Sequence, residues 1–213
     1  MAKQKKYEFT GETKIEFGVK LHRIRALVAI AAIGVAAGDL GGWVGSEKNL
    51  SHDGNAWVYG NARVTGNARV TGNARVDGNA WVTGDARVTG NARVTGNAWV
   101  YGNARVTGNA WVYGNARVDG NARVTGNARV DGDARVFGDA RVCGPIITAS
   151  RSDGYTFTIF IEQSGALKIT AGCRFFTPDE ARQHWRSTRG GTKLGDESLL
   201  IVDHLERMAA LQN

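Results

Sequence analysis

Residues 55–72 read NAWVYGNARVTGNARVTG, and this stretch contains three copies of one six-residue pattern. The pattern is Gly-Asn/Asp-Ala-x-Val-y, and it repeats without interruption as fifteen hexads across residues 54–144. Every alanine slot from Ala56 to Ala140 holds alanine, and every valine slot from Val58 to Val142 holds valine. An array of this regularity predicts a repeat protein in which each hexad contributes the same short structural unit.

Within Ala-x-Val-y, the alternation of a β-strand puts Ala and Val on one face and the x and y residues on the other. Gly-Asn marks the corner between strands, because these residue types tolerate a positive φ most cheaply. Gly-Asn could also close two-residue hairpins, but the resulting meander would leave its Val/Ala face with nothing to pack against. Three hexads can instead form a triangular coil filled by valine and alanine. We therefore predict a mainly β fold, a parallel β-helix of about five coils that rise about 4.8 Å each.

The chain divides into an N-terminal β cap at 1–53, the β-helix at 54–144 and a C-terminal part at 145–213. A cap is required because the first coil would otherwise expose the amides of its edge. The apolar run ALVAIAAIGVAA at 26–37 is shorter than the roughly 20 residues of a spanning helix. We expect it to belong to the cap and predict no membrane partner; the alternative is a targeting signal.

The C-terminal part is predicted to be a small α+β domain. Pro145 is expected to stop the array, and residues 156–162 and 166–172 are expected to pair as a hairpin. A helix should begin at Thr177, a capping threonine followed by proline. After a loop at 186–196, a last amphipathic helix should bury one side, which holds Leu199, Val202, Leu205 and Ala209.

The hexads resemble the motif of left-handed parallel β-helices, and nearly the whole chain resembles a family of phage and prophage hexapeptide-repeat proteins of poorly defined function. The residues that carry the resemblance are YEFTGETK at 7–14, LHRIRAL at 21–27, GDLGGWV at 38–44, NLSHDGNAWVYGNARV at 49–64, ITAGCRFFTPDEAR at 169–182 and GDESLLIVDHLE at 195–206. The apolar run at 28–37 departs from the family pattern, which is shorter and more polar there. The resemblance implies left-handed winding, a viral origin and a homotrimer.

The positive charge of the chain is concentrated on the repeat. The net charge is +7, and residues 54–144 carry 11 arginines against 6 aspartates with no lysine. An all-arginine surface favours bidentate recognition of carboxylate or phosphate groups. The two cysteines, Cys143 and Cys173, are too few for a disulfide framework or a zinc site.

Because coils stack every 18 residues, the x and y residues form columns on three sides. Side one consists of Trp57, Arg75, Arg93, Trp111 and Arg129 beside Tyr59, Asp77, Thr95, Tyr113 and Asp131. Side two consists of Arg63, Trp81, Trp99, Arg117 and Arg135 beside Thr65, Thr83, Tyr101, Asp119 and Phe137. Side three consists of Arg69, Arg87, Arg105, Arg123 and Arg141 beside Thr71, Thr89, Thr107, Thr125 and Cys143.

Side three carries arginine on every coil, and its arginines and threonines are the candidate residues for binding an anion. Neighbouring guanidinium groups repel one another, so something must offset the repulsion. Solvent and counterions are one possibility, and carboxylates of a neighbouring subunit or of the C-terminal domain are another. The third is a bound anionic ligand, such as a nucleotide, an oligonucleotide or a polyanionic glycan.

Sides one and two carry outward aromatic residues that a soluble monomer rarely exposes together, namely Trp57, Tyr59, Trp81, Trp99, Tyr101, Trp111, Tyr113 and Phe137. We expect these sides to meet in a homotrimer, with Arg/Asp pairs setting the register. The alternatives are stacking platforms for bases or sugars, or simple packing along the ladder.

Many proteins with this fold are acyltransferases, but the sequence argues against an enzyme. None of the four histidines lies inside the repeat, and they are His22, His52, His184 and His204. No loop interrupts the hexads to build a pantetheine site. We therefore predict no catalytic residue, no metal ligand and no cofactor.

The leading hypothesis is a phage-encoded, non-enzymatic binding protein that acts in the cytoplasm of the infected bacterial host. It would sequester an anionic ligand, with a nucleotide immune signal as the specific form, or a host defence protein. Two alternatives stay open. One is a structural rod or virion accessory, and the other is an acyltransferase with a histidine pocket at the trimer seam.

Overall fold

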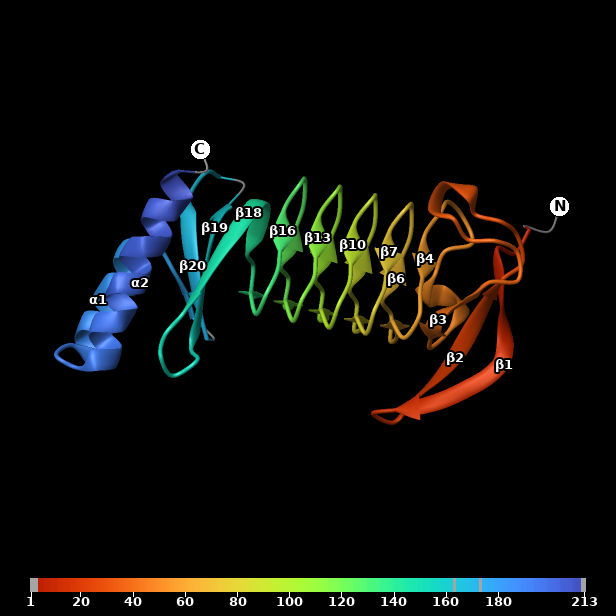
Figure 1. Ribbon diagram of the computed structural model, residues 1–213, viewed down its shortest axis with the longest axis horizontal. Coiled ribbons are helices and arrows are strands. Elements are labelled where there is room, and N and C mark those ends of the chain that lie inside the picture. Colours follow the sequence, from red (N-terminus) through yellow and green to blue (C-terminus); the bar gives the residue numbers. More distant parts are fainter. Residues whose placement is uncertain (1–3, 163, 173, 212–213) are drawn as a thin grey trace.

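The computed structural model describes residues 4–162, 164–172 and 174–211, so Cys173 lies outside the described residues. A regular solenoid lies between a β-hairpin near the N-terminus and a pair of helices at the C-terminus (Figure 1). The prediction of a mainly β repeat protein is confirmed.

The solenoid is built from two-residue strands, one in each hexad. These strands are β4 (Trp57–Val58), β5 (Arg63–Val64), β6 (Arg69–Val70), β7 (Arg75–Val76), β8 (Trp81–Val82), β9 (Arg87–Val88), β10 (Arg93–Val94), β11 (Trp99–Val100), β12 (Arg105–Val106), β13 (Trp111–Val112), β14 (Arg117–Val118), β15 (Arg123–Val124), β16 (Arg129–Val130) and β17 (Arg135–Val136). Each pairs in parallel with the strand one coil away, as Arg93 of β10 does with Trp111 of β13. This register confirms the 18-residue coil and excludes the antiparallel meander.

The strand order reproduces the three predicted columns. Side one is formed by β4, β7, β10, β13 and β16, and side two by β5, β8, β11, β14 and β17. Side three is formed by β6, β9, β12, β15 and the start of β18 (Arg141–Ser150). The outward residues of each side therefore stand in single file along the solenoid.

The inside of the coil is filled by the alanine and valine slots. Each side chain in these slots, from Ala56 to Val142, is 0 % exposed. Backbone hydrogen bonds join successive coils, and the N–H of Arg105 donates to the carbonyl of Ala122 at 2.9 Å. The core is thus one continuous apolar column whose burial stabilises every coil through its neighbours.

The corners depart from the sequence expectation in one respect. The repeat glycines from Gly54 to Gly138 have φ between +51° and +71°, as expected, but no corner asparagine among the described residues has a positive φ. The asparagine side chains instead hydrogen-bond from coil to coil. The Asn73 amide, for example, donates to Asn91 Oδ1 at 3.0 Å. Asparagine therefore stabilises the corners through hydrogen bonds between its side-chain amides, and not by adopting a positive φ.

The solenoid has about six coils rather than five, because both flanks add rungs. On side two, β3 (Leu40–Val44) pairs in parallel with β5, and on side three Leu50 bridges Val70. At the other end Pro145 lies beside Arg129. The hexad array ends there as predicted, but Pro145 does not interrupt the strand, since β18 continues through it to Ser150 and pairs with β19. It falls at a register shift in the pairing of β18 with β19, where a missing N–H is tolerated.

The N-terminal cap is a long hairpin followed by irregular chain. β1 (Tyr7–Glu16) and β2 (Val19–Ala26) pair antiparallel, and β2 pairs antiparallel with β3. Two 3-10 turns follow, η1 (Ala31–Ile33) before β3 and η2 (Glu47–Asn49) after it. In the apolar run at 26–37, Ile30 and Val35 are buried in the core. No helix among the described residues has the length and apolarity needed to cross a membrane.

Lys6 ties the start of the cap to the first coil, and it makes the stability of the fold depend on pH. Its Nζ donates to the carbonyls of Ala56 at 2.7 Å and Gly54 at 3.3 Å. Burial lowers the pKa of Lys6 from 10.5 to about 8, against the opposing effect of Asp53. Above pH 8 the folded chain releases this proton while the unfolded chain still holds it, so stability rises with pH up to 10.5.

We expect the free energy of unfolding of the wild-type protein, minus that of a Lys6→Met variant, to increase as the pH rises from about 8 towards 10.5. Urea unfolding at fixed ionic strength measures both values. A difference that stays constant or falls over this interval would show that Lys6 is not held in a desolvated site.

The C-terminal part follows the predicted order. The strands β19 (Thr156–Glu162), β20 (Leu167–Ala171) and β21 (Arg174–Phe176) extend β18 as an antiparallel sheet. Helix α1 (Pro178–Arg189) begins with the expected capping box at Thr177. Helix α2 (Lys193–Ala210) buries Val202, Leu205 and Ala209, as predicted, while Leu199, predicted with them, is half-buried against the same core. The loop expected at 186–196 is wrong, because α1 runs to Arg189 and Thr192 caps α2.

Candidate functional site

Side three presents five arginines in one column, and their side chains have no hydrogen-bond or ion-pair partner among the described residues. All five side chains are exposed. They are Arg69, Arg87, Arg105, Arg123 and Arg141. Each pairs through its backbone with the next, so the guanidinium groups follow one another at the strand spacing of about 4.8 Å. The structure stacks these five residues on adjacent coils, as the sequence predicted; their binding of an anion stays a prediction.

The companion threonines of side three stand beside the arginines and are half-buried. These are Thr71, Thr89, Thr107 and Thr125. Threonine side chains are much shorter than arginine side chains. Their hydroxyl groups therefore lie closer to the backbone than the guanidinium groups, and they make the surface between the arginines polar. The hydroxyl of Thr125 donates to the Val142 carbonyl at 3.4 Å.

Shallow hollows lie between the arginine column and the asparagine corner beside it. One near the N-terminal end has a volume of about 260 Å³ and is lined by Lys48, Asn67, Arg69, Asp85 and Arg87. The corner amide of Asn67 donates to Asp85 at 3.0 Å, which holds that carboxylate on the corner. The hollow is therefore lined by three basic groups and one acidic group, and its local charge is positive.

Side one differs from the expectation at its first coil. Trp57 is only 1 % exposed, and its ring meets Tyr7 of the hairpin edge-on at 6.4 Å. Tyr59 is half-buried, with its hydroxyl 3.4 Å from the Ile33 carbonyl. The N-terminal cap thus covers Trp57, which is not available to a second molecule.

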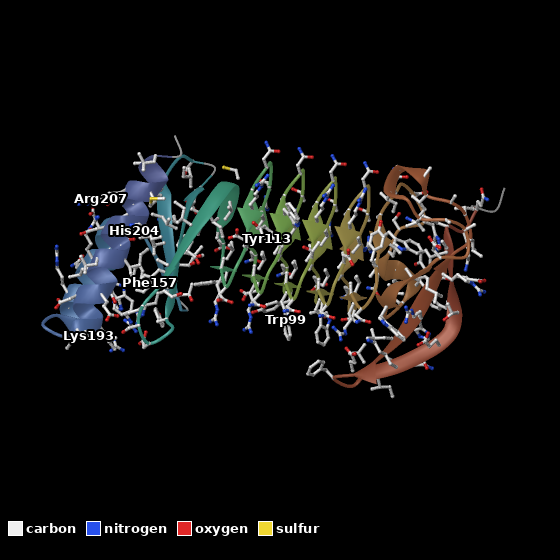
Figure 2. The ribbon with its side chains drawn as sticks, in the orientation of Figure 1. Trp99, Tyr113, Phe157, Lys193, His204 and Arg207 are labelled. Atoms are coloured by element: carbon white, nitrogen blue, oxygen red, sulfur yellow. The ribbon has the colours of Figure 1, made fainter. Side chains whose placement is uncertain are left out.

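Further along side one, aromatic rings remain at the surface. The rings of Trp111 and Tyr113 lie 4.9 Å apart, and the Arg93 guanidinium lies 5.9 Å from the Trp111 ring. Tyr113 lies on the face of the solenoid turned to the viewer in Figure 2. Its hydroxyl donates to Asp131 at 2.7 Å, and this bond raises the pKa of the phenol.

Side two begins under the hairpin. Phe17, at the turn between β1 and β2, places its ring 4.8 Å from Trp81 and leaves Trp81 only 9 % exposed. Trp81 in turn lies 5.2 Å from Trp99, which is 38 % exposed. The sequence did not single out Phe17, although a Phe-Gly pair between two alternating strands is a hairpin signal. Of the two tryptophans, Trp99 is the more exposed, while Phe17 at the hairpin turn is 81 % exposed.

Two aspartates of the y columns accept hydrogen bonds from tyrosines of the preceding coil. Tyr101 donates to Asp119 at 2.5 Å, and burial together with this bond raises the pKa of Tyr101 to about 12. Asp131 accepts from Tyr113 in the same way, and the predicted pairing of aspartates with arginines of a neighbouring subunit stays a prediction. Phe137, the last aromatic of side two, is half-buried.

The histidines lie near the two ends of the molecule. His52 stacks on Tyr7 at 4.3 Å, and His22 stacks on Phe9 at 4.7 Å, both in the N-terminal part. Burial lowers the pKa of His52. In the C-terminal part His184 stacks on Phe176. Across the described residues, no group of three or more His, Cys, Asp or Glu side chains could hold a metal ion.

The comparison with known families bears on the repeat. The family model of the YdcK β-solenoid repeat matches residues 56–72, 86–101 and 98–114, all within the solenoid. No curated protein matches the chain. The chain is therefore similar to a β-solenoid repeat over part of its coils, which agrees with the observed fold and leaves the function to be argued from the surface.

Proposed function

We propose that this protein is a non-enzymatic binding protein that sequesters an anionic ligand along side three. The observation that carries the proposal is the column of five exposed arginines without a partner in the described chain. Like charges on adjacent rungs repel one another, and an anion placed between two guanidinium groups relieves that repulsion while accepting hydrogen bonds from both.

The shape of side three favours an extended ligand. Its arginines span four rung intervals, or about 19 Å, and the hollows beside them are shallow. A linear chain of phosphate or sulfate groups matches such a column, because successive anionic groups meet successive arginines. The ligand class is therefore a linear polyanion, either an oligonucleotide or an acidic glycan. A nucleotide immune signal would be a short ligand of the same class, with only a few phosphate groups.

The proposed origin, winding and oligomeric state rest on the resemblance to phage and prophage hexapeptide-repeat proteins. We propose a phage-encoded protein that winds to the left, forms a homotrimer and acts in the cytoplasm of an infected bacterial host. The surface aromatic pair Trp111 and Tyr113 on side one supports subunit contact there. Light scattering measures the mass directly, and the proposed trimer corresponds to three chains of 22.8 kDa each.

Two variants of equal charge test the site. The first replaces the five side-three arginines with glutamine. The second, its control, replaces five arginines outside side three and side two with glutamine, namely Arg75, Arg93 and Arg129 of side one and Arg186 and Arg207 of the C-terminal helices. Binding is measured with a labelled single-stranded oligonucleotide, with heparin and with inorganic polyphosphate. We expect the first variant to lose binding at least tenfold more than the control, because only it removes the continuous column.

The three probes distinguish the sources of the ligand. Preference for the oligonucleotide identifies a nucleic acid, and preference for heparin identifies a glycan. Equal losses in the two variants would contradict the proposal, because binding would then follow net charge alone. Absence of wild-type binding to all three probes at low salt would also contradict it and would favour a structural rod.

A further inference from the structure

Side two is bounded at both ends by segments that project from the solenoid. The turn of the β1–β2 hairpin and the β18–β19 loop extend on the same side of the molecule, the lower one in Figure 1. Trp99 lies on that side, between the two projections (Figure 2). Side two is therefore bordered by a projecting segment at each end.

The C-terminal end of side two contains a hollow of about 420 Å³. Gly154 and Thr156 of the β18–β19 region line it, together with residues of three successive coils, namely Asn97, Trp99, Asn115, Arg117, Asp133 and Arg135. This volume is within the range of small-molecule sites, roughly 300–1,000 Å³. We call this hollow the side-two pocket.

The floor of the side-two pocket combines an aromatic ring with two cations. Trp99 is backed by Trp81 at 5.2 Å, which restrains its ring, and it is still 38 % exposed. The Arg117 guanidinium lies 5.6 Å from the Trp99 ring, and Arg135 follows on the next coil. Neither guanidinium has a hydrogen bond or ion pair within the described part of the chain.

The wall of the pocket supplies an acceptor. The Asn115 amide donates to Asp133 Oδ1 at 3.0 Å, which holds that carboxylate beside Arg135. Its second oxygen has no hydrogen-bond partner among the described residues. The hydroxyl of Thr156 lies 3.2 Å from that of Ser150, so the loop also presents a polar edge. The pocket thus offers a stacking face, two anion-binding groups and a carboxylate acceptor.

We propose that the side-two pocket binds a nucleotide. Its base stacks on Trp99, its phosphate accepts hydrogen bonds from Arg117 and Arg135, and Asp133 accepts from a base amine or a ribose hydroxyl. A plain anion would make no use of the exposed indole, and a neutral sugar would leave two guanidinium groups unpaired. This site is compact and lies on a different side from the arginine column, so it stands independently of the function proposed above.

The test measures binding of AMP, of adenosine and of inorganic phosphate by calorimetry and by quenching of tryptophan fluorescence. We expect AMP to bind at least tenfold more tightly than adenosine or phosphate. Trp99→Ala and Arg135→Gln should each weaken AMP binding at least tenfold. Trp99→Phe, which keeps a stacking ring, should weaken it less than threefold.

The matched control is Trp111→Ala, because Trp111 is also a surface tryptophan beside an arginine but lies on side one. This variant should bind AMP as the wild-type protein does. The variant with five glutamines on side three should also retain AMP binding, which separates this proposal from the previous one. Equal weakening by Trp99→Ala and Trp111→Ala, or AMP binding no tighter than phosphate, would overturn the proposal.

Discussion

The Val106→Asp variant is expected to lose the cooperative unfolding transition of the solenoid. Val106 is 0 % exposed and lies on β12, with Val88 and Val124 on the adjacent coils. A carboxylate placed there has no partner, and burying an unpaired charge costs several kcal/mol. Because each coil packs only on its neighbours, a defect in the middle also separates the two halves of the core. We expect a loss of more than about 4 kcal/mol in the free energy of unfolding.

The control for this experiment is Thr107→Asp, one residue further along the chain. The side chain of Thr107 points outward on side three and is half-buried, so the new carboxylate meets solvent and neighbouring arginines. Its effect should be within about 0.5 kcal/mol. Circular dichroism during urea unfolding measures both variants. Similar losses in the two would contradict the inward placement of the valine column.

A second large effect is expected from Gly108→Val. Gly108 has φ +71°, and a Cβ there would lie 3.0 Å from both the backbone N and O of Gly126 on the next coil. The left-handed conformation costs a residue with a Cβ about 1–2 kcal/mol, and a branched side chain adds the steric conflict. We expect a total loss of about 3 kcal/mol or more in the free energy of unfolding.

Gly138 provides the comparison that separates the two causes. Its φ is +65°, but a Cβ there meets nothing within 4 Å because no further corner stacks on it. Gly138→Val should therefore lose only the conformational part, about 1–2 kcal/mol. Urea unfolding of the two variants gives the difference directly. Equal losses would show that the backbone conformation alone, and not the stacking of corners, accounts for the glycine at each hexad.

The solenoid was predictable because its positions are filled without variation. With alanine and valine in every inward slot, only one arrangement buries both, and the period then fixes which outward residues stand in line. Thr177-Pro178 likewise identified the start of α1 from local chemistry alone. These features depend on residues near one another in the sequence, so the sequence carried enough information to place them.

The rest depends on contacts between distant segments. Nothing local to Trp57 indicates that Tyr7 will cover it, and nothing near Trp81 indicates that Phe17 will pack on it. The same holds for Pro145. A strand can contain this proline because the pairing of β18 with β19 shifts register there, so that its missing N–H breaks no regular pair. The columns of the candidate site could therefore be read from the sequence, but the cover over two of its tryptophans and the walls of the side-two pocket could not.

For the corner asparagines, the sequence predicted the position but not the physical reason for it. Their place at the corner was read correctly, but the reason was wrong, because glycine alone takes the positive φ while asparagine forms the amide ladder. Both explanations fit the same residue preference. Only the backbone angles distinguish them.

The central claim, that side three is the anion-binding side, is tested most directly by the salt dependence of oligonucleotide binding. Each arginine–phosphate contact on a single strand contributes about 0.7 to the slope of log K against log salt concentration. The variant with five glutamines on side three should therefore show a slope shallower than that of the wild-type protein by about 3–4. The control variant, with its five glutamines on side one and the C-terminal helices, has the same net charge and should differ from the wild-type slope by less than about 1. Equal changes of slope in the two variants would contradict the claim.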